Sequence, residues 1–238
     1  MTKYDYNGKV VLITGAGSGF GKMAAEKFSA AGASLALSDI NVESVDAVAE
    51  ELRTVDANVV SMACDVSKEG DVQQFVAATV AEYGKLDVAI NNAGMAHELT
   101  KMTECDEALW DITVAVNLKG VFLCMKHELQ QMSQQGCGVI LNVSSAAGIL
   151  GAPLLGPYAA AKHGVVGLTR TGAVEFARKG IRVNAICPAF SHTPLVDKLV
   201  EQKDESRLSN MASHIPMQRL GQSDEIVQAM LWACSDDN

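Results

Sequence analysis

The sequence lacks the cysteine pairs that mark a disulfide scaffold or a zinc site. Its six cysteines are scattered along the chain, with no Cys-x-x-Cys pair and no histidines at zinc-ligand spacing nearby. We therefore expect reduced, mostly buried thiols and no metal site.

The sequence also lacks features of export, membrane insertion and nucleic-acid binding. Residues 1–8 are polar and lead straight into a strand-like run, without the apolar segment of a signal peptide, and no apolar run is long enough to cross a bilayer. The formal net charge of -9 argues against nucleic acid or an anionic membrane as the main partner. These absences predict a cytoplasmic protein.

No low-complexity linker or internal repeat divides the 238 residues, and short β-branched runs alternate with longer amphipathic stretches. This alternation is typical of βαβ units with a parallel sheet. We predict one α/β domain over residues 1–238, a Rossmann-type doubly wound parallel sheet with helices on both faces. The expected strands are 9–14, 34–38, 58–62, 86–90, 138–143 and 181–186; the expected helices are 22–31, 41–54, 68–82, 104–134, 157–178 and 223–234; an irregular substrate loop covers about 189–216.

A glycine cluster, Thr14 to Gly21, stands between the first strand and the first helix. It does not fit the G-x-G-x-x-G spacing because Phe20 occupies the last required position; the glycines are instead Gly15, Gly19 and Gly21. Backbone amides and a helix N-terminus at this place can hold a pyrophosphate, although turns need glycine for structural reasons alone. The cluster's position predicts a nucleotide site.

Asp39 ends the second strand, where an acidic side chain meets the adenosine ribose hydroxyls and repels a 2′-phosphate. Its alternative role, starting the next helix, is taken by Asn41, a good N-cap. No Arg or Lys in the glycine loop or just after Asp39 offers a partner for that phosphate. NAD is therefore predicted over NADP. Asp65, after the third strand, could contact adenine or equally cap a helix beginning near Ser67.

Tyr158 and Lys162 lie four residues apart in the opening turns of the helix that Pro157 begins, so they share one face. A nearby ammonium favours the phenolate, which makes the pair suited to acid/base chemistry. Alone, this spacing is common by chance. Polar clusters at two further strand ends, Asn91–Gly94 and Asn142–Gly148, point to the same edge of the sheet, where open α/β proteins bind ligands.

Together these motifs resemble the short-chain dehydrogenase/reductase family, over Lys9 to about Asp236. The resemblance implies that Tyr158 is the general acid/base, that Lys162 lowers its pKa and holds the nicotinamide ribose, that Ser145 polarises the substrate oxygen, and that Asn117 completes a proton relay. Ser144 competes with Ser145, and Asn117 could instead be a helix-breaking structural residue. The implied cofactor-binding residues are Gly15, Ser18, Gly19, Phe20, Gly21, Asp39, Asp65, Val66, Asn91, Ala93, Gly94, Tyr158, Lys162, Pro188 and Thr193.

Other expectations concern the surroundings of the site. Ala189 replaces a glycine that is usual in the family, and the family's further strand after the last helix is missing from a sequence that ends at Asn238. Apolar residues predict a pocket under a loop: Leu150, Pro153, Leu154, Phe190, Leu195 and Met211. Loop histidines at 97, 192 and 214 are expected to be solvated and receive no role. The family pairs the helix after Pro157 in a dimer, usually within a tetramer.

The sequence thus predicts an NAD(H)-dependent oxidoreductase that interconverts a secondary alcohol and a ketone. Two alternatives stay open: an NADPH-dependent 3-oxoacyl carrier-protein reductase, and a catalytically silent nucleotide-binding sensor. The substrate's identity does not follow from the sequence.

Overall fold

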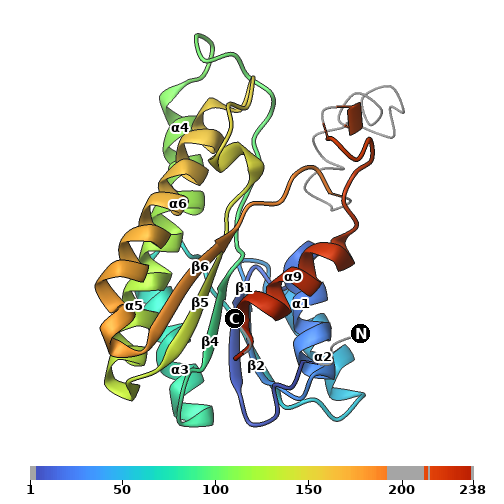
Figure 1. Ribbon diagram of the computed structural model, residues 1–238, viewed down its shortest axis with the longest axis vertical. Helices are drawn as coiled ribbons and strands as arrows, with labels where there is room; N and C mark the ends of the chain where they lie inside the picture. Colours follow the sequence, from blue (N-terminus) through green and yellow to red (C-terminus); the bar gives the residue numbers. More distant parts are fainter. Residues whose placement is uncertain (1–3, 192–211, 214, 237–238) are drawn as a thin grey trace.

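Six parallel strands form the central sheet, in the order β3-β2-β1-β4-β5-β6 (Figure 1). The computed structural model describes residues 4–191, 212–213 and 215–236. The strands are β1 (Val10–Thr14), β2 (Ser34–Asp39), β3 (Val59–Ala63), β4 (Val88–Asn91), β5 (Gly138–Val143) and β6 (Ile181–Ile186).

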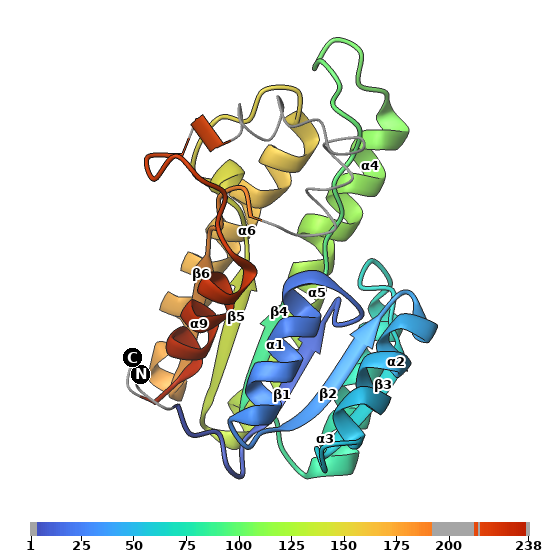
Figure 2. The same cartoon turned by 90° about the vertical axis from the view of Figure 1, so that its right-hand side faces the viewer.

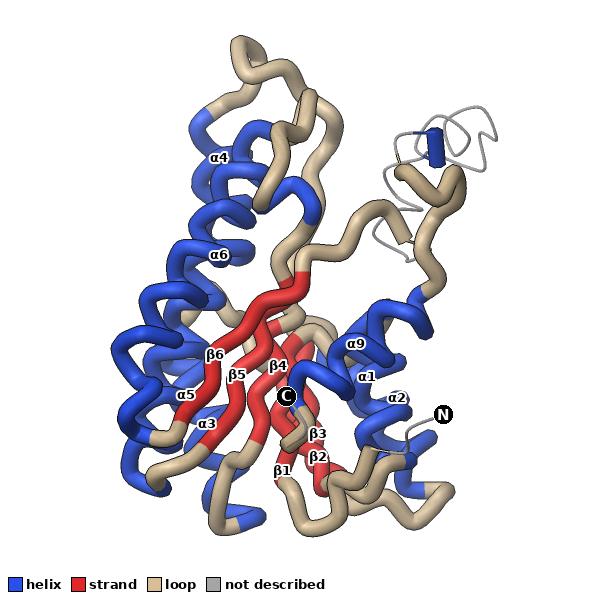
Figure 3. Tube along the Cα trace, viewed as in Figure 1, coloured by secondary structure: helices blue, strands red, loops and turns tan. Residues whose placement is uncertain are grey.

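Helices cover both faces of this sheet (Figures 1 and 3). One layer holds α1 (Gly19–Ala30), α2 (Val42–Arg53) and α9 (Ser223–Cys234); the other holds α3 (Glu69–Tyr83), α5 (Gly120–Gln135) and α6 (Gly156–Phe176). A view turned by 90° places α1 and α9 in front of the sheet (Figure 2). The predicted Rossmann-type fold is confirmed.

Alternate residues of β1 supply the two halves of the core. Ile13 packs with Phe28 of α1 in the cluster under α1, α2 and α9, whereas Leu12 packs with Phe75 of α3 in the cluster on the opposite face. Both Leu12 and Ile13 are fully buried. Because successive side chains of a strand point to opposite faces, a continuous apolar run is what a sheet covered on both sides requires.

The chain order reverses between β1 and β4, since β2 and β3 extend the sheet on one side and β5 and β6 on the other. The chain after β1 leads to α1 on one face of the sheet and the chain after β4 leads to α4 (Glu107–Val114) and α5 on the other, and open α/β proteins bind ligands at such a reversal of strand order. The glycine loop and Asn91–Gly94 both lie at this point.

Several helix boundaries differ from the predicted ones, and α6, for example, ends at Phe176 rather than Arg178. The first helix starts at Gly19 rather than Lys22, and the predicted helix 104–134 is divided into α4 (Glu107–Val114), a π-helical turn (Ala115–Lys119) and α5. Helix α3 begins at Glu69 with Lys68 as its N-cap residue, so Asp65 is not the cap. Short 3₁₀ turns lie at Ala146–Gly148 and Ala177–Lys179.

The helical run from Glu107 to Gln135 is long and apolar enough to cross a membrane by length and composition, with a mean hydropathy of 1.5. The expectation that no such run exists is therefore wrong. One such helix is weak evidence for a membrane span. This run packs against α3, α6 and the sheet, and that packing buries part of its apolar residues, such as Val121, Leu123 and Leu129.

Candidate active site

The glycine loop brings the backbone of β1 close to that of β4. Gly15 has a positive φ of 65°, and a Cβ atom there would lie 2.7 Å from the Cα of Ala93. A Cβ on Gly21 would lie 2.1 Å from the carbonyl oxygen of Gly15. Among the described residues, the Ser18 side chain makes no capping bond to α1, so the positive end of this helix faces outward. Such a cradle fits the pyrophosphate of a dinucleotide.

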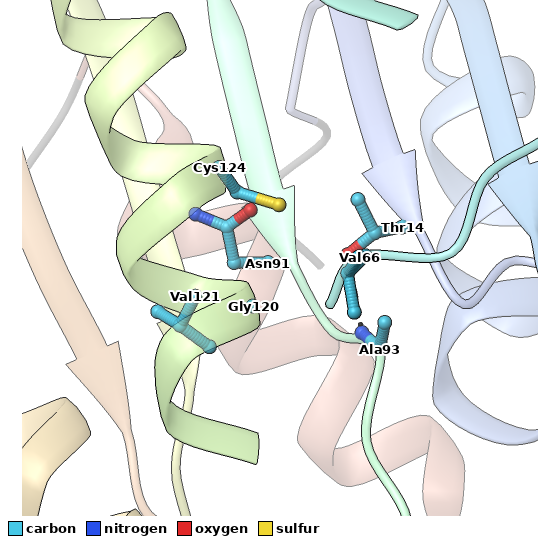
Figure 4. A pocket seen from close by; sticks show the side chains of 7 residues that line it. All are labelled: Thr14, Val66, Asn91, Ala93, Gly120, Val121 and Cys124. Carbon is cyan, nitrogen blue, oxygen red and sulfur yellow. Dashed lines mark hydrogen bonds between the residues drawn. The ribbon is translucent and has the colours of Figure 1, made fainter. Parts of the chain in front are cut away.

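The side chains of Thr14 and Asn92, which belong to the predicted clusters but were given no role of their own, hold this loop in place. Thr14 Oγ1 accepts hydrogen bonds from the backbone N–H groups of Asn92 and Ala93, both at 3.1 Å. The side-chain amide of Asn92 donates to the carbonyls of Thr14 at 3.0 Å and Gly15 at 2.9 Å. Figure 4 shows Thr14 and Ala93 in a narrow crevice that is lined by Thr14, Val66, Asn91, Ala93, Gly120, Val121 and Cys124.

Asp39 lies against the glycine loop. One carboxylate oxygen accepts from the backbone N–H of Gly17 and the other from that of Asn41, each at 3.0 Å. Asn41 caps α2 by accepting from the N–H of Ser44, which confirms its predicted role. Ile40, which the sequence analysis passed over, is 72% exposed beside Asp39 and offers an apolar surface next to the loop.

Asp65 and Val66 follow β3 at the same edge of the sheet. One oxygen of Asp65 accepts from the backbone N–H and the hydroxyl of Ser67, and the other lies 3.2 Å from Lys68 Nζ. These partners, chiefly the Ser67 hydroxyl, lower the pKa of Asp65. Val66 is buried and touches the crevice of Figure 4. Asp65 therefore stabilises its own turn, and its contact with adenine stays a prediction.

Asn91 points into the core rather than out of it. Its side-chain amide donates to Glu128 at 2.9 Å and to Asn142 at 3.0 Å, and Asn142 donates in turn to Thr169 at 2.9 Å. All four side chains are buried. The Asn91 side chain is therefore not available to a nucleotide, and a contact of Asn91 with a nucleotide would have to be made by its backbone.

Asn117 occupies the π-helical turn and is fully buried. Its amide donates to the carbonyls of Met95 at 2.9 Å and Thr113 at 3.1 Å, and its Oδ1 accepts from the N–H of Met95 at 3.0 Å. A Cβ on Gly94 would lie 2.8 Å from Asn117 Oδ1 and 3.6 Å from Lys162 Nζ. The Asn117 side chain thus fixes the loop that passes the predicted catalytic lysine.

The two serines after β5 have different surroundings. Ser144 is buried, and its hydroxyl donates to the carbonyl of Lys162 at 2.9 Å. Ser145 is half-buried, and its hydroxyl accepts from the N–H of Ala147 at 3.2 Å, which leaves its own proton free to be donated. Ser145 is also a hydrogen-bonding neighbour of Tyr158. This difference favours Ser145 over Ser144 as the residue that meets a substrate.

Tyr158 and Lys162 face each other on α6, with Lys162 Nζ 5.6 Å from the centre of the Tyr158 ring. Lys162 is buried and donates to the carbonyl of Val143 at 2.9 Å; burial lowers its pKa to about 8. Burial also raises the pKa of Tyr158, and the Ser145 hydroxyl opposes this effect. The structure therefore brings Ser145, Tyr158, Lys162 and Asn117 to one edge of the sheet.

The loop after β6 lies beside the Ser145 turn, because the Pro188 carbonyl accepts from the N–H of Ala146 at 2.8 Å. Ala189 does not have a positive φ, so alanine is accommodated without strain in place of the family's glycine. Thr193, His192, Leu195, Met211 and His214 lie outside the described residues.

His97, in the loop after β4, is 5% exposed. The expectation that it is solvated is wrong. A single histidine in an irregular segment, between Ala96 and Glu98, belongs to no helical or strand periodicity from which its burial could be predicted.

Comparisons with known proteins give a consistent answer. A family model described as enoyl-(acyl carrier protein) reductase matches residues 15–238. The 3-oxoacyl-[acyl-carrier-protein] reductase of Thermotoga maritima is 40% identical and covers 97% of this chain and 92% of the relative. The cyclohexanol dehydrogenase of an Acinetobacter strain is 37% identical, over 98% of this chain and 90% of the relative.

Solved structures agree. The crystal structure of levodione reductase has a TM-score of 0.94 at 39% identity and covers 98% of this chain and 92% of that one. A short-chain type dehydrogenase/reductase from Mycobacterium marinum has a TM-score of 0.91 at 30% identity, over 98% and 91%. This chain belongs to the short-chain dehydrogenase/reductase family. As a member of that family it is an oxidoreductase that uses a nicotinamide cofactor and a small-molecule substrate.

Proposed function

We propose that this short-chain dehydrogenase/reductase is NAD(H)-dependent and interconverts a secondary alcohol and a ketone, with Tyr158 as the general acid/base. The observation that carries the proposal is the meeting of Ser145, Tyr158 and Lys162 at the edge of the sheet that also holds the glycine loop. NAD, when bound, supplies hydride transfer.

The protein's own residues would perform the rest. Ser145 donates a hydrogen bond to the substrate oxygen, and Tyr158 takes the hydroxyl proton in oxidation or returns it in reduction. Lys162, held by the Val143 carbonyl, favours the phenolate and orients the ribose. Asn117 fixes the Met95 backbone beside them, and its relay of protons to water is part of the proposal.

The preference for NAD is supported by Asp39 at the glycine loop. Its carboxylate suits ribose hydroxyls and repels a 2′-phosphate. Lys22, the first basic residue after the loop, forms an ion pair with Glu51 at 2.6 Å, so its charge is already matched and is not reserved for a 2′-phosphate. The predicted binding residues, including Ser18, Gly19, Phe20, Pro188 and Thr193, complete the proposed NAD site.

A second candidate, an NADPH-dependent 3-oxoacyl carrier-protein reductase, is favoured by the 40% identity to the Thermotoga enzyme. Turnover of a panel of secondary alcohols, ketones and 3-oxoacyl thioesters, with NAD and NADP in parallel, separates the two. We expect a kcat/KM at least tenfold higher with NAD, and a preference for NADPH would support the reductase.

Substitution of the acid/base residue tests the mechanism. Tyr158→Phe should reduce turnover by at least a thousandfold and leave NADH binding, followed by fluorescence titration, nearly intact. Lys162→Ala should reduce both turnover and NADH binding. Tyr83→Phe is the matched control, since the Tyr83 hydroxyl bonds to the Leu35 carbonyl. If NAD binds tightly and no alcohol or ketone reacts, the chain is instead a silent nucleotide sensor.

We also propose that the enzyme acts in the cytoplasm as a homodimer or homotetramer. Apolar side chains remain exposed on the helices of one layer: Trp110 of α4 at 45%, Phe122 of α5 at 47% and Val174 of α6 at 82%. A subunit interface over these packed helices would cover such side chains.

A further inference from the structure

His97 carries an acceptor atom without a partner. Its Nδ1 lies 2.7 Å from the carbonyl oxygen of Glu98. Because a carbonyl can only accept, the hydrogen of the ring must be on Nδ1, and Nε2 of the neutral imidazole is then an acceptor. Among the described residues, nothing donates to Nε2, although this atom is buried.

A buried acceptor without a donor costs free energy. Proteins keep few such atoms, and each one calls for an explanation, such as an ordered water, an ion or a functional role. The ring is 5% exposed, so bulk solvent does not satisfy it. The geometry therefore leaves one hydrogen-bonding position for a donor from outside the described chain.

The loop that carries His97 is tied at both ends to the catalytic residues. On one side, the backbone of Met95 is held by Asn117. On the other, the N–H of Thr100 donates to the Leu154 carbonyl, and Thr100 pairs with Leu155, three residues before Tyr158. The two segments rise together above the carboxyl ends of the strands (Figures 1 and 2).

We propose that His97 is a specificity residue and that its Nε2 accepts a hydrogen bond from a second hydroxyl group of the substrate. The substrate class is then a diol, or a hydroxyketone in the reverse direction, rather than a simple secondary alcohol. The inference rests on the proposed function: the first hydroxyl reacts at Tyr158, and the second is bound unchanged.

A pair of substitutions tests this role. His97→Asn keeps a short amide that can reach the Glu98 carbonyl but removes the acceptor at the Nε2 position, whereas His97→Gln keeps an acceptor there. The probes are cyclohexanol and the 1,2-, 1,3- and 1,4-cyclohexanediols with NAD. The quantity measured is the ratio of kcat/KM for each diol to that for cyclohexanol, because a partly unfolded variant lowers both values equally.

In the unsubstituted enzyme we expect at least one diol to exceed cyclohexanol by about tenfold or more. His97→Asn should abolish that preference, mainly through KM because the contact is remote from the reacting carbon, and His97→Gln should retain it. An enzyme that oxidises cyclohexanol without favouring any diol, or a preference that survives in His97→Asn, overturns the inference alone. Absence of turnover with every alcohol would instead overturn the proposed function.

Discussion

Asp39 is the residue on which the proposed choice of NAD depends. Its carboxylate accepts from the N–H of Gly17 at 3.0 Å, and our proposal puts the adenosine ribose of the cofactor beside it. We expect Asp39→Ser to raise kcat/KM for NADP relative to NAD by about tenfold or more, because the like-charge repulsion is removed.

Steady-state kinetics with both cofactors measure this ratio. Glu43→Gln, an exposed position in the first turn of α2, is the control for a general loss of negative charge and should leave the ratio unchanged. An equal ratio in Asp39→Ser and the unsubstituted enzyme would place Asp39 away from the ribose.

Sequence reasoning at single positions succeeded where the residue type itself implies the chemistry. Asn41 caps α2 as predicted, and Tyr158 faces Lys162. His97 was wrongly expected to be solvated, and Asn92 received no role of its own because its partners lie far from it in the chain. Asn92 matters through the Thr14 and Gly15 carbonyls, contacts that only the β1–β4 pairing creates.

Among the secondary-structure elements, α5 is joined to the sheet by a buried carboxyl group. Glu128 accepts from Asn91 of β4, and Asn91 also donates to Asn142 of β5. Burial raises the pKa of Glu128 to about 8. Glu128 Oε1 and Asn91 Oδ1 both lack a hydrogen-bond partner among the described residues. A proton on the Glu128 carboxyl group removes the charge and makes this group a possible donor.

This raised pKa predicts how stability changes with pH. Glu128 keeps its proton in the folded protein up to about pH 8, whereas in the unfolded chain it ionises near its ordinary value. The folded state therefore binds the extra proton, and the free energy of unfolding falls as the pH rises from about 4.5 to 8. Glu128→Gln removes this term, and its amide can donate to Asn91 Oδ1.

We expect Glu128→Gln to gain stability over the unsubstituted protein as the pH rises, by about 2 kcal/mol or more between pH ~5.5 and ~8.5. Urea unfolding at the two pH values measures the difference. Glu82→Gln, at an exposed position on α3, is the control and should follow the unsubstituted protein. Parallel pH dependence for Glu128→Gln would show that the carboxyl group ionises without penalty in the folded state.

The order of helices and strands was predictable because the periodicity of apolar residues is strong in a sheet covered on both faces. The π turn at Ala115–Lys119 was not. It inserts one wide turn into a continuous apolar pattern, and it turns Asn117 toward Met95. Asn117 does not break the helix, since it lies within the helical run. It has a structural role beside its predicted catalytic one, because its side chain holds the loop beside Lys162.

For the molecule as a whole, both helical layers leave apolar side chains uncovered, and in the layer of α1, α2 and α9 these include Trp232 at 51%. The layer of α4, α5 and α6 exposes Trp110, Phe122 and Val174, and the window of highest hydropathy within Glu107–Gln135 is 39% buried. We propose that these side chains are covered in the assembled protein and that the partner is a second copy of the chain.

We therefore expect light scattering during size-exclusion chromatography to give at least twice the mass of the 25.2 kDa chain. Combining Phe122→Lys with Val174→Lys should shift the protein to monomer, because two cations would be buried without partners in each half of the interface. Val55→Lys is the matched control: Val55 is 69% exposed after α2, in the opposite layer, and should keep the assembly. A monomeric unsubstituted protein would refute pairing through this layer, and a dimer that survives the double substitution would place the interface elsewhere.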